Sequence, residues 1–177
     1  MQTIIRSNSE QRSISVTAFD ASRIYKLGPT ESLRPSGPNG TGSRLLVGGA
    51  QSEGQYTFRY YRAEATMYPH THEREDENVY VLSGNPTVVL GETTYELAPG
   101  DFLFMPHHVK HAIYTNDPWE GFSVSSPGYI FDEMMDDLAN LIAADAATPE
   151  AMGEALKRGG ITVHEGKWYG ETPIVQR

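Results

Sequence analysis

Six short runs of β-forming residues between residues 44 and 116 are the feature that most constrains the fold of this chain. The runs are rich in Val, Tyr, Phe and Thr, and they read RLLVGG, QYTFRYYRAEA, ENVYVLSG, TVVLGETTYELAPG, DFLFMP and HAIYTN. Gly, Pro, Asn or Ser residues lie at the ends of these runs. Short strands separated by turn residues are typical of an antiparallel sandwich or barrel. The sequence therefore predicts an all-β fold for this part of the chain.

The segments before and after these runs differ from them in composition and in the spacing of apolar residues. Residues 28–43 combine Pro, Gly, Ser and Asn, which is typical of an irregular arm or loop. Residues 131–146 place apolar side chains at helical spacing, and residues 149–160 begin with Pro and end with paired Gly, so two helices are expected. We therefore divide the chain into an N-terminal arm that packs on the β-domain (1–44), the β-domain with the site (45–127), and a C-terminal helical extension and tail (128–177).

Composition excludes several classes of protein and site. An apolar content of 38% in 177 residues favours a soluble globular domain, and no apolar stretch is long enough to span a membrane. The net charge of −9 without a basic stripe argues against nucleic acid or an anionic membrane as partner. The absence of cysteine excludes disulfides and thiolate metal sites. Residues 1–13 lack the hydrophobic region of a signal peptide, so a cytoplasmic location is expected.

Two histidines one residue apart, followed by an acid, indicate a metal site. His70 and His72 point to the same face if the segment is extended, as Pro69 before them favours. Glu77 opens the next run after a turn, and can return across from the two imidazoles as an anionic ligand. His111, at the start of a later strand, would complete a set of three imidazoles and one carboxylate. Without thiolates, such a set suits one divalent Fe, Ni, Co, Mn, Cu or Zn ion.

The spacing of these residues resembles that of the cupin superfamily. HTH-x4-E-x6-G (residues 70–84) is similar to the first cupin motif, and GDFLFMPHHVKH (residues 100–111) is similar to the second, with Asn116 near the position of its final Asn. The resemblance covers residues 45–127. It implies a small jelly-roll β-barrel with a metal ion near the middle of its lumen.

One position departs from the second motif, which has Gly where this chain has His108. That turn position requires a left-handed backbone, which His tolerates better than most residues. The departure leaves His107 and His108 as alternatives to His111, although the spacing favours His111. The other acids of the first motif, Glu73, Glu75 and Asp76, are expected to be solvated turn charges, with a role in orienting a ligand imidazole as the alternative.

Strand alternation predicts an aromatic lining for the interior. Phe58 and Tyr60 share a face with Tyr56, and Val79 shares one with Glu77. Such a lining would suit a flat, largely apolar organic molecule, although ordinary core rings are the alternative. The predicted substrate pocket comprises Phe58, Tyr60, Val79, Phe102, Phe104, Phe122 and Phe131.

The order of short motifs after the β-domain resembles that of one group within the cupin superfamily. Pro127, Gly128 and Phe131 lead into a predicted helix, followed by a Thr-Pro-Glu segment at 148–150, and this resembles the single-domain quercetinase-like cupins of bacteria. The resemblance implies a metal-dependent dioxygenase that adds O₂ to a flavonol or a similar enolisable aromatic or polyketide-type small molecule. It makes Glu77 both a metal ligand and the catalytic base.

Two other classes of function stay open. A non-oxidative cupin enzyme of natural-product metabolism, such as a cyclase, isomerase or lyase, would use the same ligands around a Lewis acid. A non-catalytic cupin would only bind its ligand. In each case the exposed sheet edges of such a barrel favour a homodimer.

Overall fold

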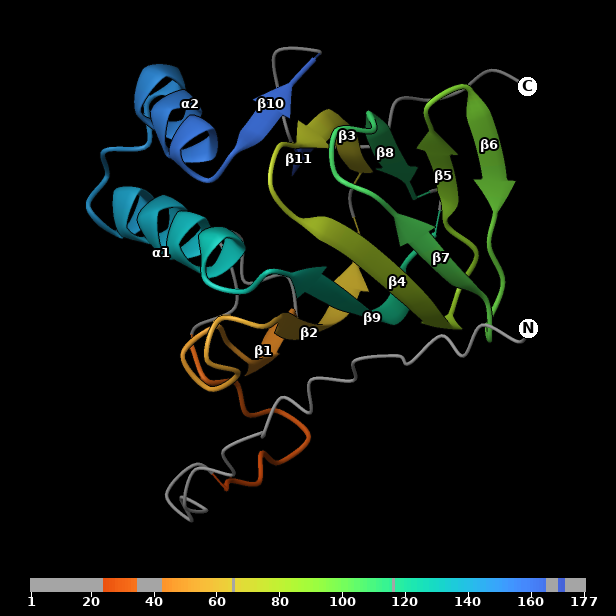
Figure 1. Cartoon of the computed structure of the whole chain (residues 1–177), viewed down its shortest axis with the longest axis horizontal. Helices are drawn as coiled ribbons and strands as arrows, with labels where there is room; N and C mark the ends of the chain where they lie inside the picture. Colours follow the sequence, from red (N-terminus) through yellow and green to blue (C-terminus); the bar gives the residue numbers. More distant parts are fainter. Residues whose placement is uncertain (1–23, 35–42, 65, 116, 165–168, 171–177) are drawn as a thin grey trace, which may run out of the picture.

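Two antiparallel sheets lie face to face, with a pair of helices at one end (Figure 1). The computed structural model describes residues 24–34, 43–64, 66–115, 117–164 and 169–170. The predicted all-β class is confirmed. Among the described strands no pairing joins one sheet to the other, so the fold is a two-layer jelly roll, not a closed barrel.

The first sheet has the strand order β1-β2-β9-β4-β7, and the second has the order β10-β3-β8-β5-β6, with β11 also paired to β3. The strands of the first sheet are β1 (Arg44–Val47), β2 (Thr57–Ala63), β9 (Trp119–Ser126), β4 (Asp76–Ser83) and β7 (Phe102–Met105). Those of the second are β10 (Ile161–Val163), β3 (Thr66–His72), β8 (His111–Tyr114), β5 (Thr87–Leu90), β6 (Thr93–Glu96) and β11 (Tyr169–Gly170).

An apolar cluster fills part of the space between the sheets, and we call it the main core. Alternate residues of the strands build it, because every second side chain of a strand points inward. Trp119 is its largest member and is 1% exposed. The main core comprises Ala63, Met67, Val79, Val81, Val88, Leu97, Met105, Ile113 and Trp119.

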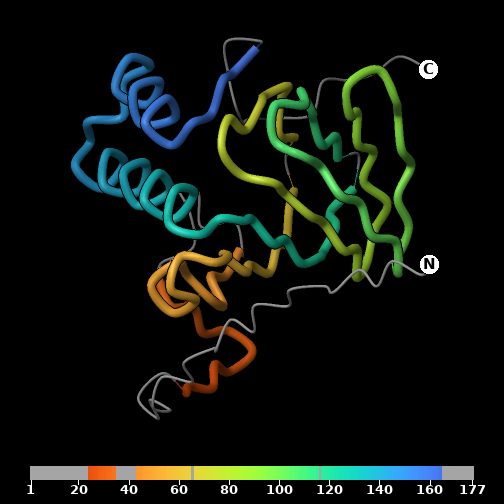
Figure 2. The backbone as a smooth tube through the Cα atoms, viewed as in Figure 1, coloured from red at the N-terminus to blue at the C-terminus, as the bar shows by residue number. Residues whose placement is uncertain are grey.

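The two predicted helices are confirmed as α1 (Ile130–Ala143) and α2 (Pro149–Arg158). Thr148 caps α2, since its side chain accepts a hydrogen bond from Ala151 N at 3.2 Å. The helices pack on each other around Met134 and Leu138. Figure 2 shows the chain running from β9 directly into α1, and from α2 back into β10. That return, which places β10 beside the histidine-bearing strand β3, is not apparent from the sequence.

The described part of the N-terminal arm lies along β1. Tyr25 Oη donates to the carbonyl of Leu46 at 2.6 Å, and Leu33 N donates to the carbonyl of Leu45 at 3.0 Å. Arg34 forms an ion pair with Asp136 of α1. The rest of the predicted arm, residues 1–23 and 35–42, lies outside the described residues. Within the described ranges, neither helix has the length and apolar character that crossing a membrane requires.

Candidate metal centre

Four side chains from three strands converge between the sheets: His70 and His72 on β3, Glu77 on β4 and His111 on β8. Their potential ligand atoms all lie within 4.8 Å of one another. His70 and His111 are direct cross-strand partners, so their rings share the inner face of the second sheet. Glu77 reaches them from the first sheet, and its Oε2 lies 3.5 Å from His72 Nε2 and 3.3 Å from His111 Nε2. The structure thus brings together the four residues selected from the sequence.

The Nδ1 atom of each of the three imidazoles faces a hydrogen-bond acceptor. The Nδ1 atoms of His70, His72 and His111 lie 2.7 Å from Tyr68 O, 3.4 Å from Glu75 Oε2 and 3.0 Å from Val109 O. A carbonyl or carboxylate oxygen can only accept, so these contacts favour a proton on Nδ1 and leave the Nε2 lone pair available. Among the described residues, the buried Nε2 atoms of His72 and His111 have no hydrogen-bond partner. This donor set therefore fits a divalent first-row ion.

The pKa values of the cluster agree with that fit. Burial, followed by the neighbouring His111 and His72, lowers the pKa of His70 to about 3, so its ring is neutral at pH 7. Burial raises the pKa of Glu77, but His111, whose Nε2 lies 3.3 Å away, and the other imidazoles nearby outweigh that effect and lower the pKa to about 2. Burial lowers the pKa of His111, but Glu77 outweighs it and raises that pKa. A neutral His70 ring and an ionised Glu77 carboxylate are the ligand forms that a cation binds.

The histidines of the turn after β7 lie outside the cluster. His107 and His108 are exposed, and their Nδ1 atoms contact Asp76 Oδ1 at 2.6 Å and Glu73 Oε2 at 3.3 Å. His108 has a φ of 63°, which confirms the left-handed backbone expected where the second motif has Gly. Geometry therefore selects His111 for the cluster. Asn116 lies outside the described residues.

Glu75 differs from its sequence-based expectation. The expectation of a solvated turn charge is wrong for Glu75, which is 1% exposed, and its position fits the alternative, a role in orienting a ligand imidazole. Its Oε1 accepts a hydrogen bond from Phe131 N at 2.8 Å, at the start of α1, while Oε2 faces His72. Glu75 therefore joins a candidate ligand to the first turn of the helix, where an acid is also favoured by the helix dipole. The acid-rich turn hinted at this role, but the partner lies 56 residues away.

Replacing Glu75 with Gln is expected to lower the affinity for a divalent ion about 10- to 100-fold, the usual cost of losing a carboxylate behind a ligand imidazole. Glutamine keeps an oxygen for Phe131 N but loses the charge that orients and polarises His72. Competition between the protein and a chromogenic chelator for Co²⁺ measures the affinity. The matched control is Glu73→Gln, which changes an exposed carboxylate in the same turn. Equal affinities of the two variants would contradict this role.

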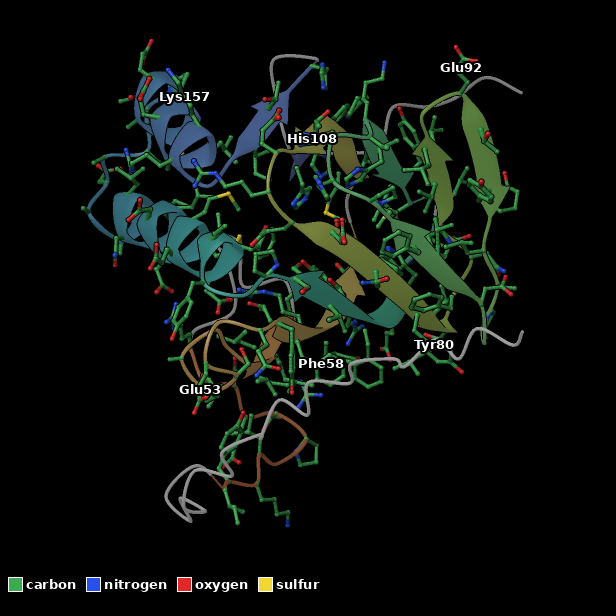
Figure 3. The ribbon with its side chains drawn as sticks, in the orientation of Figure 1. Glu53, Phe58, Tyr80, Glu92, His108 and Lys157 are labelled. Carbon is green, nitrogen blue, oxygen red and sulfur yellow. The ribbon has the colours of Figure 1, made fainter. Side chains whose placement is uncertain are left out.

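The predicted aromatic lining is largely wrong, because the strand alternation runs the other way. On β2, Thr57 and Arg59 are buried, while Phe58 and Tyr60 point outward. Figure 3 shows Phe58 on the side of the first sheet that faces away from the second. The residues of the predicted pocket that lie on this outer face are Phe58, Tyr60, Phe102, Phe104 and Phe122.

The outward-facing rings pack on one another. Phe58 and Phe122 have ring centroids 5.1 Å apart, and Phe102 and Phe104 remain 61% and 50% exposed. Alternation assigns residues to two faces, but a face rich in aromatic rings need not be the inner one. Val79 and Phe131 do lie inside. Val79 belongs to the main core, and Phe131 stacks on His72 with centroids 6.0 Å apart.

Comparison with known proteins supports the resemblance to cupins. Residues 58–122 match the family model described as a cupin domain, and this segment contains all four candidate ligands. No curated protein matches the chain. Similar solved structures include KdgF from Halomonas sp., which is 26% identical with a TM-score of 0.45 over 49% of this chain and 78% of that chain. A cupin-2 domain containing protein from Shewanella frigidimarina is 18% identical with a TM-score of 0.42 over 48% of this chain and 78% of that chain. The DMSP lyase DddQ from Ruegeria pomeroyi is 23% identical with a TM-score of 0.38 over 41% of this chain and 39% of that chain.

Proposed function

We propose that this protein is a metal-dependent oxygenase of the quercetinase type, which adds O₂ to a flavonol or a similar enolisable aromatic or polyketide-type small molecule. The supporting observation is the position of Glu77, whose two oxygens face different partners. Oε2 faces the imidazole nitrogens of His72 and His111, while Oε1 accepts a hydrogen bond from Ser123 Oγ at 3.4 Å. One oxygen can therefore belong to the metal centre while the other remains available to a substrate proton.

The three imidazoles would hold the ion together with Glu77 Oε2. A bound redox-capable ion would supply Lewis acidity toward the substrate oxygen and a path for electrons to O₂. Four protein ligands would leave room for substrate on an ion that takes more than four ligands, and open positions are typical of catalytic sites. The Nδ1 contacts keep the three rings oriented, so the substrate meets ligands that are already in place.

Glu77 would act as the general base of the reaction. In this step the O–H bond of the substrate hydroxyl breaks, a proton bonds to Glu77 Oε1, and the electron pair stays on the substrate oxygen as an oxyanion. Glu77 is 3% exposed and the three histidines are 1–2% exposed, so bulk water is kept away from the proton. Ser123, beside Oε1, holds the carboxylate in a fixed orientation.

Oxygen dependence is the direct test. Metal-loaded protein is expected to consume O₂ in a 1:1 ratio with one member of a panel of flavonols and related enolisable aromatics, and to stop when O₂ is removed. An oxygen electrode and chromatography of the same reaction measure the two rates, and protein stripped of metal is the control. Turnover that continues without O₂ would overturn the proposal in favour of a cyclase, isomerase or lyase. Tight binding without turnover would instead indicate a ligand-binding protein.

A further inference from the structure

We infer that Thr57 and Arg59 form a subsite for an anionic oxygen group of the substrate, either a carboxylate or an ionised phenol. This inference rests on the proposed function, because that function brings the substrate to the metal centre. The two residues lie on β2, which is separated from the Glu77-bearing strand β4 only by β9. They face the space between the sheets, and the proposed reaction uses neither of them.

The register of the first sheet places both residues on the face that bears Glu77. Thr57 lies opposite Ser125, which lies opposite Glu77, and directly opposed residues of antiparallel strands point to the same side. Arg59 lies opposite Ser123 in the neighbouring row. Two strand spacings separate Thr57 from Glu77, or about 10 Å. That distance matches an aromatic molecule of two or three rings with one end at the metal centre.

Both residues carry a buried donor that has no acceptor in the part of the chain that the structure describes. Thr57 is 0% exposed and Arg59 is 6% exposed. Within the described ranges of the chain, Thr57 Oγ1 and Arg59 Nε have no hydrogen-bond partner. Buried polar groups are nearly always paired, and two orphaned donors two residues apart on one inner face are unusual. An oxygen acceptor would satisfy them, and an anionic oxygen makes the stronger bond with a guanidinium.

Arg59 is held in place and is linked to the metal centre through one ring. Its Nη2 donates to Asp132 Oδ1 at 3.0 Å, and Asp132 Oδ2 accepts from Gly49 N at 2.7 Å. The guanidinium lies over the ring of Phe131, 5.0 Å from its centroid, and the same ring stacks on His72. These contacts fix the guanidinium, and among the described residues Nε–H has no acceptor. The guanidinium is therefore preorganised for an oxygen acceptor.

Thr57→Val is the sharpest test, because it removes the hydroxyl and nearly keeps the shape of the side chain. The probes are 3-hydroxyflavone-4′-carboxylate and its methyl ester, bound to Co²⁺-loaded protein without O₂ and followed by fluorescence quenching. The variant is expected to bind the acid about 10-fold more weakly than the native protein does and the ester equally well. Its metal content should not change, and its thermal midpoint without probe should be equal or higher, since no hydrogen bond is lost.

A second variant tests the guanidinium without leaving a buried charge unpaired. Arg59→Met combined with Asp132→Asn removes both charges, and Asn can still accept from Gly49 N. It is expected to abolish the preference for the acid over the ester, while Arg62→Met, an exposed arginine of the same strand, keeps it. Comparing 4′-hydroxyflavonol above and below the pKa of its phenol shows whether a phenolate serves as well as the carboxylate.

Equal losses for acid and ester, or an unchanged preference in both variants, would overturn the subsite. The binding assay does not depend on turnover. A protein that prefers the acid but never consumes O₂ would therefore reject the oxygenase and retain the subsite. Conversely, O₂-dependent turnover with no preference for the acid would reject only the subsite.

Discussion

The His70→Ala variant is expected to bind a divalent transition ion more than about 100-fold more weakly than the native protein, and to lose the activity that depends on it. Loss of a group behind a ligand already costs up to about 100-fold, and loss of a ligand costs more. His70 is central in the cluster, since its ring centroid lies 4.3 Å from that of His111 and 5.2 Å from that of His72. Its neutral ring is also a better donor than a protonated one.

Elemental analysis after dialysis, together with chelator competition for Co²⁺, measures this effect. His164→Ala is the matched control, because His164 is a histidine on the neighbouring strand segment that contacts Thr71 and not the cluster. Circular dichroism of both variants shows whether the fold is kept. If His70→Ala folds and still retains one equivalent of ion with unchanged affinity, the cluster is not the metal site.

With its site kept filled by excess metal, the Glu77→Gln variant is expected to lose about 10²- to 10⁴-fold in kcat, the usual contribution of a general base. Glutamine preserves the volume and offers an amide oxygen in place of Oε2, but it cannot take a proton from the substrate. Steady-state O₂ consumption and metal content are measured on the same preparation. Activity that survives with the metal bound would show that Glu77 is not the base.

Ser123→Ala provides the comparison for Glu77. This change removes only the hydrogen bond to Oε1, so we expect a loss of at most about 10-fold in kcat, in line with one ordinary hydrogen bond. A loss as large as that of Glu77→Gln would instead assign the proton transfer to the hydroxyl of Ser123.

The candidate ligands could be recognised in the sequence because their geometry is mostly local. His70 and His72 share a face by the two-residue period of a strand, and a short turn returns the chain to Glu77. His111 required the register between β3 and β8, which the second motif supplied through its spacing. The second helix could also be predicted from the sequence, since Pro149 and the capping residue Thr148 are local signals of a helix start.

The burial of Glu75 and Arg59 could not be predicted from the sequence, because each side chain depends on a partner far along the chain. Glu75 finds a partner in Phe131 N at the first turn of α1, and Arg59 finds one in the carboxylate of Asp132. A charge without such a partner would remain in water.

The expected homodimer is not tested by a single chain and stays a prediction.

The sequence by itself determined the alternation of each strand, the two helices and the spacing of the four candidate ligands, because these follow from backbone periods of a few residues. Only the tertiary structure decided which face of the first sheet is inner. It placed Thr57 and Arg59 inside and Phe58 and Tyr60 outside, against the apparent hydrophobic pattern. The reason is that burial depends on what the opposite layer presents. Here that layer presents three imidazoles, and α1 contributes the carboxylate of Asp132, so the polar face is the one that can be satisfied inside.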